Sequence, residues 1–278
     1  MKELFDSVCF KCSQITTTSY STSFSFGIKA LDKQLHAPIY NIYGFVRFAD
    51  EIVDTFHGYD KESLLLKFKQ DTHQAIKDKI SLNPILNSFQ DVVNRYNIDI
   101  ELVDTFLDSM EMDLKPELYD KSKYDKYILG SAQVVGLMCL KVFVAGNSAI
   151  YKDLKPYAMS LGSAFQKINF LRDIKADFLT LGRTYFPDVD LQKFNAEDKR
   201  IIELDVQKDF DHALLGIKKL PIKSRTGVYL AYTYYYKLFK KIRLLSSTEI
   251  LNHRIRINNG LKILLIVTTL IKSKLRLL

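Results

Sequence analysis

The spacing of apolar residues restricts this chain to helices over nearly its whole length. Apolar side chains recur every three or four residues, the period of an amphipathic helix, whereas the two-residue alternation typical of strands is rare. The segments with the helical pattern are residues 64–80, 85–96, 100–114, 134–145, 161–181, 201–220 and 227–245. The pattern therefore predicts an all-α protein.

The prolines fall outside most of these segments and predict helix starts or connections. They are Pro38, Pro84, Pro116, Pro156, Pro187 and Pro221. No Gly/Ser linker, long charge run or internal repeat divides the 278 residues. A chain of this length buries a sizeable core without disulfides or structural metals. We therefore expect residues 1–278 to form a single all-helical domain.

Motifs of several common enzyme classes are absent from the sequence. There is no GxGxxG after a strand and no GxxxxGK[ST], so dinucleotide and P-loop sites have no support. HExxH and GxSxG are missing too, and the five histidines are scattered. Lys and Arg outnumber Asp and Glu by 40 to 32, which favours anionic partners. Because the basic residues are dispersed and match no binding motif, we expect no nucleic-acid partner.

Cys9 and Cys12 have CxxC spacing, but no second pair completes four zinc ligands. We interpret both as thiols on a helix, with a metal or redox role as the alternative. The first residues are partly acidic and lack a continuous apolar core, unlike a secretory signal. No continuous apolar stretch reaches the ~18 residues of a membrane span, and the longest run, 261–271, contains Lys262. We expect a cytoplasmic protein.

Two aspartates four residues apart mark the first candidate site. Asp50 and Asp54 share one face of a helix, and Arg47 lies on that face as well. Because like charges at this spacing repel, we expect a compensating cation, and Mg²⁺ prefers carboxylate oxygens. Glu51 points about 100° away from the pair, beside the site or toward the surface. A single pair of this kind is common on surface helices.

The same DxxxD spacing recurs at Asp173 and Asp177. Gln166 and Asn169 extend the pair into one polar stripe, although the residues flanking the stripe are apolar. A polar stripe on a buried helix must be paired or must line a wet cavity. Two such helices, each with an arginine beside its carboxylates, suit a pocket for metal-bridged diphosphate.

Taken in order, the motifs resemble those of the phytoene/squalene synthase family of head-to-head prenyl transferases, and its bacterial phytoene synthases most closely. The resemblance covers roughly residues 19–245. The matching segments are Ser21-Thr-Ser23-Phe24, Arg47 to Asp54, Met110 to Leu114, Tyr127, Val134 to Met138, Gln166 to Asp177 and Gly182 to Pro187. Leu129 stands where the family often has a tyrosine, while Tyr127 remains two residues upstream. The role usually given to that tyrosine therefore stays open.

The resemblance implies an isoprenoid-synthase-type helical bundle around a central cavity. It also implies an enzyme that condenses two prenyl diphosphates with Mg²⁺, or with Mn²⁺ in its place. Diphosphate leaves one substrate, the double bond of the other attacks the allylic cation, and a cyclopropylcarbinyl diphosphate forms and then rearranges. Such a site must hold diphosphate and keep water away from carbocations.

The resemblance also assigns roles to individual residues. The catalytic residues are Asp50, Asp54, Asp173, Asp177 and Tyr127. The metal ligands are Asp50, Asp54, Asn169, Asp173 and Asp177. The substrate-binding residues are Ser21, Ser23, Arg47, Gln166, Asn169, Arg172 and Arg183. For Ser21 and Ser23, capping of a helix start is the alternative. The candidates for an apolar tunnel, with core packing as their alternative, are Phe24, Phe26, Phe45, Phe165 and Phe170.

The product is a further expectation. We expect phytoene from two geranylgeranyl diphosphates, formed without NADPH, because the chain has the length of compact bacterial members and no Rossmann fingerprint. Squalene or dehydrosqualene from farnesyl diphosphate is the first alternative. A catalytically inactive, membrane-associated scaffold of the same fold is the second.

Residues 251–278 have the composition of an amphipathic helix that lies on a membrane surface. Basic residues precede the apolar run 261–271, and Lys272, Lys274 and Arg276 follow it. We expect peripheral contact with the inner face of an anionic membrane, with a last helix packed on the domain as the alternative. No obligate protein partner is evident.

Overall fold

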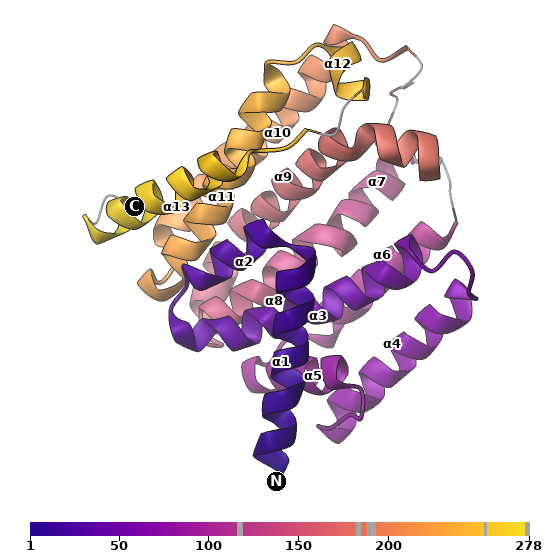
Figure 1. The fold of residues 1–278 in the computed structure, drawn as a ribbon, viewed down its shortest axis with the longest axis vertical. Helices are drawn as coiled ribbons and strands as arrows, with labels where there is room; N and C mark the ends of the chain where they lie inside the picture. Colours follow the sequence, from indigo (N-terminus) through magenta and orange to yellow (C-terminus); the bar gives the residue numbers. More distant parts are fainter. Residues whose placement is uncertain (116–118, 182–184, 188, 190–192, 253–254, 276–278) are drawn as a thin grey trace.

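The computed structural model describes residues 1–115, 119–181, 185–187, 189, 193–252 and 255–275, with side chains of α9 described as far as Ile174. Every regular element in these residues is helical (Figure 1). The all-α prediction is therefore confirmed.

Each of the seven predicted segments corresponds to a helix, with moderate shifts at their ends, and the other described helices fall outside those segments. In chain order they are α1 (Lys2–Tyr20), α2 (Thr22–Lys29), α3 (Lys33–Asp54), α4 (Lys61–Asp78), α5 (Pro84–Tyr96), α6 (Ile100–Leu114), α7 (Lys121–Ile128), the π-helical turn η1 (Leu129–Gln133), α8 (Val134–Phe143), α9 (Ser148–Leu181), α10 (Ala196–Lys219), α11 (Ile222–Arg243), α12 (Ser247–Asn252) and α13 (Asn259–Lys274). The largest shift is in α9, which begins at Ser148 rather than at residue 161.

The two larger of the three apolar cores in the described residues hold the helices in two groups. The first core joins α3, α4, α5, α6 and α8, and the second joins α7, α9, α10 and α11. In Figure 1 the N-terminal helices lie on one side and α9–α13 on the other, with α2, α7 and α8 between them. Phe45 belongs to the first core, fully buried and stacked 3.8 Å from Phe89 between ring centroids. Of the two interpretations given for Phe45, core packing is the one that the structure confirms.

Two prolines lie inside helices, contrary to the prediction that prolines separate them. Pro38 is in α3 and Pro156 is in α9. Each ring removes the hydrogen bond to the carbonyl four residues earlier. Those carbonyls belong to Gln34 and Lys152, which are exposed and near the helix starts, so water can satisfy them. The cost of an interior proline is therefore small at both positions.

The segment from α7 to α8 is one continuous helical rod that changes to a π-helical turn over Leu129–Gln133. Glycine is required inside this turn: a Cβ on Gly130 would lie 2.5 Å from Ser109 Cβ of α6. Single π-turns inside helices are frequent at functional sites because they alter which side chains share a face.

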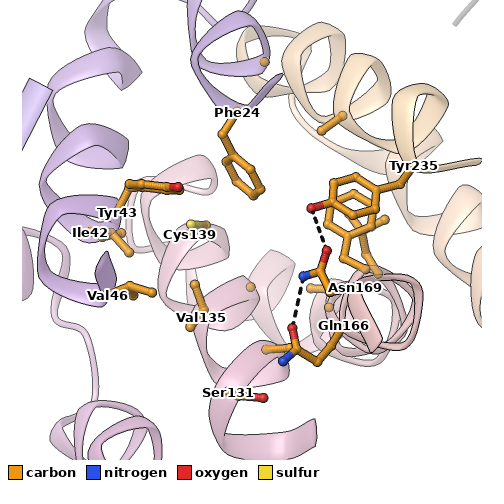
Figure 2. Close-up of a pocket in the computed structure, with 18 of the residues that line it drawn as sticks. Phe24, Ile42, Tyr43, Val46, Ser131, Val135, Cys139, Gln166, Asn169 and Tyr235 are labelled. Atoms are coloured by element: carbon orange, nitrogen blue, oxygen red, sulfur yellow. Dashed lines mark hydrogen bonds between the residues drawn. The ribbon is translucent and has the colours of Figure 1, made fainter. Parts of the chain in front are cut away.

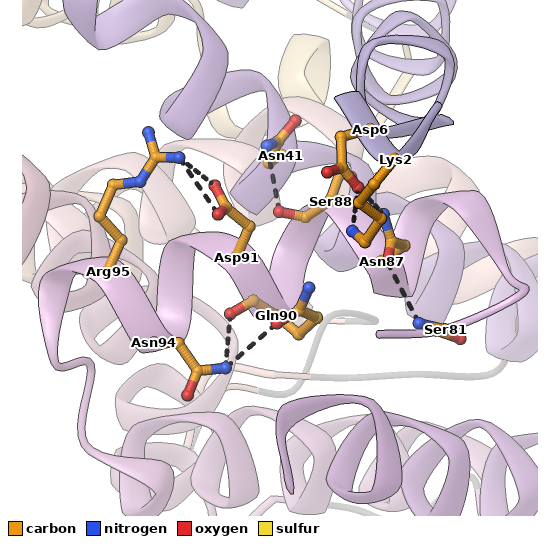
Figure 3. Close-up of polar contacts among 10 residues, drawn as sticks. All are labelled: Lys2, Asp6, Asn41, Ser81, Asn87, Ser88, Gln90, Asp91, Asn94 and Arg95. Carbon is orange, nitrogen blue, oxygen red and sulfur yellow. Dashed lines mark hydrogen bonds and ion pairs between the residues drawn. The ribbon is translucent and has the colours of Figure 1, made fainter. Parts of the chain in front are cut away.

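Polar contacts attach α5 to its neighbours, as Figure 3 shows. Asn41 of α3 donates to the carbonyl of Ser88 at 3.1 Å, and Asn87 donates to Asp6 of α1 at 2.9 Å. The buried hydroxyls of Ser13 and Ser88 share a hydrogen bond of 2.7 Å. Buried polar groups paired in this way set the register between α1, α3 and α5.

Among the described residues, one helical stretch, Lys121–Phe143, is long and apolar enough to cross a membrane, with a mean hydropathy of 1.3. From the sequence, the expected longest apolar run was instead 261–271. In the structure 44% of the window is buried, and several of its side chains line the internal cavity. For a helix that lines an internal cavity, length and composition are weak indicators of a membrane span.

Candidate active site

A cavity of about 650 Å³ lies between the two groups of helices. Its walls come from α2, α3, α6, α9, α10, α11 and the rod from α7 to α8. Figure 2 shows Ile42, Tyr43 and Val46 of α3 on one side and Gln166 and Asn169 of α9 on the other. The predicted stripes of α3 and α9 therefore line one space from opposite walls.

The cavity is elongated along α9. Lining residues of this helix extend from Leu154 to Asp173, which corresponds to about 28 Å of helix axis at about 1.5 Å per residue. The carboxylates lie toward the Asp173 end, while Leu154, Tyr157 and Leu161 make the other part apolar. The space is suited to a long apolar chain with an anionic head.

On α3, Asp50 lies in the cavity wall in a crowd of negative charge. Burial, followed by the charge of Asp54, raises its pKa to about 8, and the charge of Asp113 adds to this effect. Arg47 opposes it from 3.9 Å. Both Asp50 and Asp54 line the cavity, and the raised pKa indicates that the charges of the amino acids alone do not balance there.

Arg47 is held mainly by Glu51 rather than by the aspartates. Its guanidinium forms an ion pair with the carboxylate of Glu51 one turn later and lies 4.4 Å from the ring centroid of Tyr20. Among the described residues, no group accepts a hydrogen bond from the buried Nε of Arg47. A buried donor of this kind fits an anion such as a phosphate oxygen.

On α9, the arginine and the aspartate of the motif bind each other. Arg172 Nε donates to both carboxylate oxygens of Asp173 at 3.1 Å, and its NH2 group contacts the same carboxylate. Burial by itself lowers the pKa of Arg172, but Asp173 and neighbouring groups outweigh it and raise the pKa. Both side chains line the cavity.

A short hydrogen-bonded chain orients Asn169. The hydroxyl of Tyr235 donates to Asn169 Oδ1 at 3.3 Å, and Asn169 Nδ2 donates to Gln166 Oε1 at 3.2 Å (Figure 2). The ring of Tyr235 stacks on Phe165 with 4.0 Å between centroids. Since a carbonyl oxygen has two lone pairs, Asn169 Oδ1 can also accept from, or bind, a ligand in the cavity.

Tyr127 reaches the cavity from α7. It is buried, and its hydroxyl donates to Asp113 Oδ2 of α6 at 2.8 Å. Burial, reinforced by the charge of Asp113, raises its pKa well above the usual value. Leu129, in contrast, packs against the first core and is not among the residues found in the cavity wall. Tyr127 therefore occupies the cavity while Leu129 serves the core.

Some of the two predicted serines and the four remaining phenylalanines line the cavity, and the others do not. Ser21 lines the cavity and also caps α2 by accepting from the backbone of Phe24 at 3.2 Å. Ser23 lies in α2 but not among the lining residues. The predicted tunnel residues Phe24, Phe165 and Phe170 line the cavity. Phe26, which is 37% exposed, does not, so its prediction was wrong.

Two predicted site residues lie at the edge of what the structure describes. Asp177 belongs to the helical span of α9, but its side chain is outside the described part. Arg183 lies outside the described residues altogether. Their predicted roles remain predictions.

Two residues of this site, Asp113 and Tyr235, were missed from the sequence, and the place of Glu51 was left open. Asp113 was part of a matching motif without a role of its own, although its place on the same helix face as Phe106 and Met110 is a usable signal. Glu51 stands four residues after Arg47, the spacing of a helical ion pair, and was placed beside the site or on the surface. Tyr235 belongs to the second core, and the sequence carries no signal for its contact with Asn169.

The donor set fits a hard divalent cation. Among the described side chains no three acidic, histidine or cysteine groups form a preformed cluster. The carboxylates of Asp50, Asp54 and Asp173 and the amide oxygen of Asn169 instead line one cavity. Mg²⁺ takes oxygen ligands and often completes its shell with water and substrate phosphates. Burial and the neighbouring charge of Asp54, which together raise the pKa of Asp50, agree with such an ion.

An all-helical fold with an acidic, arginine-bearing end and a long apolar cavity defines a class of isoprenoid-synthase-type proteins. Residues 17–260 match the family described as Squalene/phytoene synthase. The chain therefore belongs to the squalene/phytoene synthase family, whose members are prenyltransferases that join prenyl diphosphates head to head. The family uses a divalent metal with its diphosphate substrates.

Individual relatives are distant. The chain is 28% identical over 204 residues to the 4,4'-diapophytoene synthase of Staphylococcus haemolyticus, a match that covers 71% of this chain and 68% of the relative. It is 25% identical over 185 residues to the phytoene synthase of Mycobacterium bovis, covering 66% of this chain but only 59% of that protein. A solved dehydrosqualene synthase complex has the same fold, with a TM-score of 0.83, 19% identity and 99% of both chains covered.

Proposed function

We propose that this chain condenses two molecules of geranylgeranyl diphosphate into phytoene. The observation that carries the proposal is one elongated cavity along about 28 Å of α9, with carboxylates and arginines toward one end and apolar residues along the rest. The acidic end suits the diphosphate, and the apolar part suits a twenty-carbon chain. The family supplies the reaction type, and the choice of this substrate is our inference.

In this proposal the two arginines act differently on the diphosphate. Arg47, fixed by Glu51 and Tyr20, donates its buried Nε–H to a phosphate oxygen. Arg172, bound to Asp173, offers its remaining N–H donors on the opposite wall. Charge-assisted hydrogen bonds of this kind stabilise the leaving diphosphate more than the bound substrate. When bound between Asp50, Asp54, Asn169, Asp173 and Asp177, Mg²⁺ supplies further positive charge to the phosphate oxygens.

The remaining residues protect the reacting carbons. Phe24 packs on Tyr43 at 5.4 Å between centroids, and Phe165 stacks on Tyr235. These rings line the cavity next to its acidic end, where they exclude water and offer π-faces to a developing cation. Tyr127, hydrogen-bonded to Asp113, keeps its hydroxyl proton and does not act as an anionic nucleophile.

The experiment is a substrate competition. Purified protein is incubated with Mg²⁺ and equal amounts of farnesyl and geranylgeranyl diphosphate, with and without NADPH, and the hydrocarbons are identified by mass spectrometry. We expect a C40 product whose yield does not depend on NADPH. A dominant C30 product would refute the substrate assignment. No diphosphate release from either substrate would refute the enzyme and favour the inactive scaffold.

A second candidate is dehydrosqualene or squalene synthesis from farnesyl diphosphate, because one relative is a 4,4'-diapophytoene synthase. The length of the cavity distinguishes the shorter substrate from the longer one. Ala158 lines the cavity on α9, about 22 Å of helix axis from Asp173. Ala158→Phe is expected to shift the preference of a phytoene synthase toward the shorter substrate. Ala149→Phe, at an exposed position of the same helix, is the matched control and leaves the preference unchanged.

The same proposal includes the protein's setting. We infer a single catalytic domain over residues 1–278, located in the cytoplasm, with Mn²⁺ able to replace Mg²⁺ and with no need for NADPH, nucleic acid or an obligate protein partner. Cell fractionation with an antibody tests the location, and metal-replacement assays test the ion.

A further inference from the structure

The last helix, α13, has a continuous apolar face that no other described helix covers. Its large apolar side chains that are more than 40% exposed are Ile263, Leu264, Val267, Leu270 and Ile271. At about 100° per residue these side chains share an arc of about 120°. Single exposed apolar residues are ordinary on a protein surface, whereas a contiguous face marks an interaction site.

The opposite face of α13 is packed on the protein. Leu265 and Thr269 are 5% and 2% exposed. Thr226 of α11 shares a 2.7 Å hydrogen bond with Ser273, and the ammonium of Lys262 lies 5.9 Å from the ring centroid of Tyr234. Figure 1 shows α13 beside α11 at the edge of the molecule. The exposed face is therefore held in a defined orientation.

The charge of this segment indicates the chemistry of the occupant. Residues 252–278 contain no aspartate or glutamate and six lysines and arginines: Arg254, Arg256, Lys262, Lys272, Lys274 and Arg276. Lys272 and Lys274 are exposed at the end of α13. A second copy of the chain would bring the same cations together without a carboxylate from this segment to compensate. An apolar face bordered by lysines instead complements an anionic bilayer.

We propose that the apolar face of α13 docks on anionic membranes, with the helix lying in the interface. The 16 residues of α13 span about 24 Å, less than the ~30 Å hydrocarbon core of a bilayer. Because one face stays bound to α11, the other face alone enters the lipid, and Lys272 and Lys274 reach the headgroups. Binding is reversible and weakens with salt.

The docked bilayer lies next to the α2 wall of the cavity. Lys262 Nζ donates to Thr22 Oγ1 at 3.3 Å, and Thr22 follows Ser21, which lines the cavity. An apolar ligand leaving the cavity on this side would meet lipid rather than water. The docking itself does not depend on the proposed substrate.

The test measures vesicle binding without substrate. The variant Ile263→Glu/Val267→Glu places two charges on the exposed face and leaves the buried residues intact. Deleting the segment is less suitable, because Ile250, Ile255 and Ile257 belong to the second core. Flotation with phosphatidylcholine vesicles containing phosphatidylglycerol is expected to show at least a tenfold loss of binding for this variant. Circular dichroism and thermal melting check that the variant is folded.

The matched control is Leu4→Glu/Val8→Glu, since Leu4 and Val8 are 67% and 49% exposed on α1. We expect this control to bind like the wild type, and wild-type binding to fall in high salt and on purely zwitterionic vesicles. Equal binding by the α13 variant, an equal loss in the α1 control, or no binding by the wild type would overturn the proposal. A wild-type dimer that dissociates in the α13 variant would overturn it as well, because the face would then join two copies.

Discussion

The two aspartate motifs have the same spacing but opposite charge arrangements. On α9, Arg172 binds the first aspartate of its own motif, Asp173. On α3, Arg47 binds Glu51 and approaches Asp50 only to 3.9 Å. The repeated motif therefore produces two different walls. On the α9 wall the charges of the arginine and the aspartate balance each other, whereas on the α3 wall the aspartate has other negative charges beside it.

This difference indicates a division of labour across the cavity. Burial, together with the charges of Asp54 and Asp113, raises the pKa of Asp50 to about 8, so the α3 wall has the greater need of an added cation. Arg47, with a buried Nε that no described group engages, has the greater capacity to hold a phosphate. The α9 wall is closer to neutrality and depends on its internal ion pair. The following substitutions test this contrast.

Asp173→Asn is expected to have the largest effect, because it changes both activity and stability. Removing the carboxylate is expected to lower turnover at least about a hundredfold, the scale of a lost electrostatic contact at a reacting group. It also leaves Arg172 with a weaker partner, which we expect to lower the free energy of unfolding by about 1–3 kcal/mol. Diphosphate release and urea unfolding measure the two effects. Wild-type stability would show that the pair does not support the fold.

Asp50→Asn is expected to lower turnover by about the same factor with little change in stability. Its contact with Arg47 is long. With a pKa of about 8, the carboxyl is mostly uncharged near pH 7 without a cation, so the amide replaces a similar neutral group. We therefore expect the free energy of unfolding to stay within about 0.5 kcal/mol of the wild type. The same two assays apply. Near-normal turnover by the folded variant would contradict the metal-binding role of this residue.

Glu51→Gln tests whether Arg47 must be held in place. Without the carboxylate, the guanidinium is less fixed, and we expect a rise of about three- to tenfold in KM for the prenyl diphosphate, in line with the ~0.5–1.5 kcal/mol of one hydrogen bond. Glu62→Gln, at an exposed position at the start of α4, is the control. An unchanged KM in Glu51→Gln would mean that Tyr20 alone positions Arg47.

Tyr235→Phe is expected to have the smallest effect. The change removes the hydroxyl that donates to Asn169 but preserves the stack on Phe165, so we expect a two- to tenfold loss of turnover from ~0.5–1.5 kcal/mol. Tyr234→Phe, one residue earlier on α11, provides the control. A hundredfold loss would indicate that the Tyr235 hydroxyl takes part in the chemistry directly.

Most of the helices were predictable because their signal is local. The predicted segment 100–114 has the same ends as the observed helix, because its apolar spacing is regular over this range. The prolines of α3 and α9 were wrongly predicted to lie outside helices. The energetic cost of a proline inside a helix depends on whether water reaches the carbonyl that loses its hydrogen bond. That exposure is a property of the folded surface, and no spacing rule reports it.

The sequence predicted those site residues that lie together on one face of a single helix. Asp50, Asp54, Gln166, Asn169 and Asp173 line the cavity as their spacing suggested, because the helical period alone decides which side chains share a face. Contacts between helices were not predictable. Asp113 meets Tyr127 from another helix, and Tyr235 meets Asn169 across 66 residues of sequence.

The sequence by itself determined an all-helical chain, two acidic stripes and a basic, apolar final segment, because composition and period are carried by neighbouring residues. Tertiary structure decided that the stripes line one cavity, that Arg47 pairs with Glu51, and that α13 keeps one apolar face outside the fold. These outcomes depend on distances of a few ångströms between separate helices. Ion pairs and burial respond to such distances steeply, and sequence spacing does not record them.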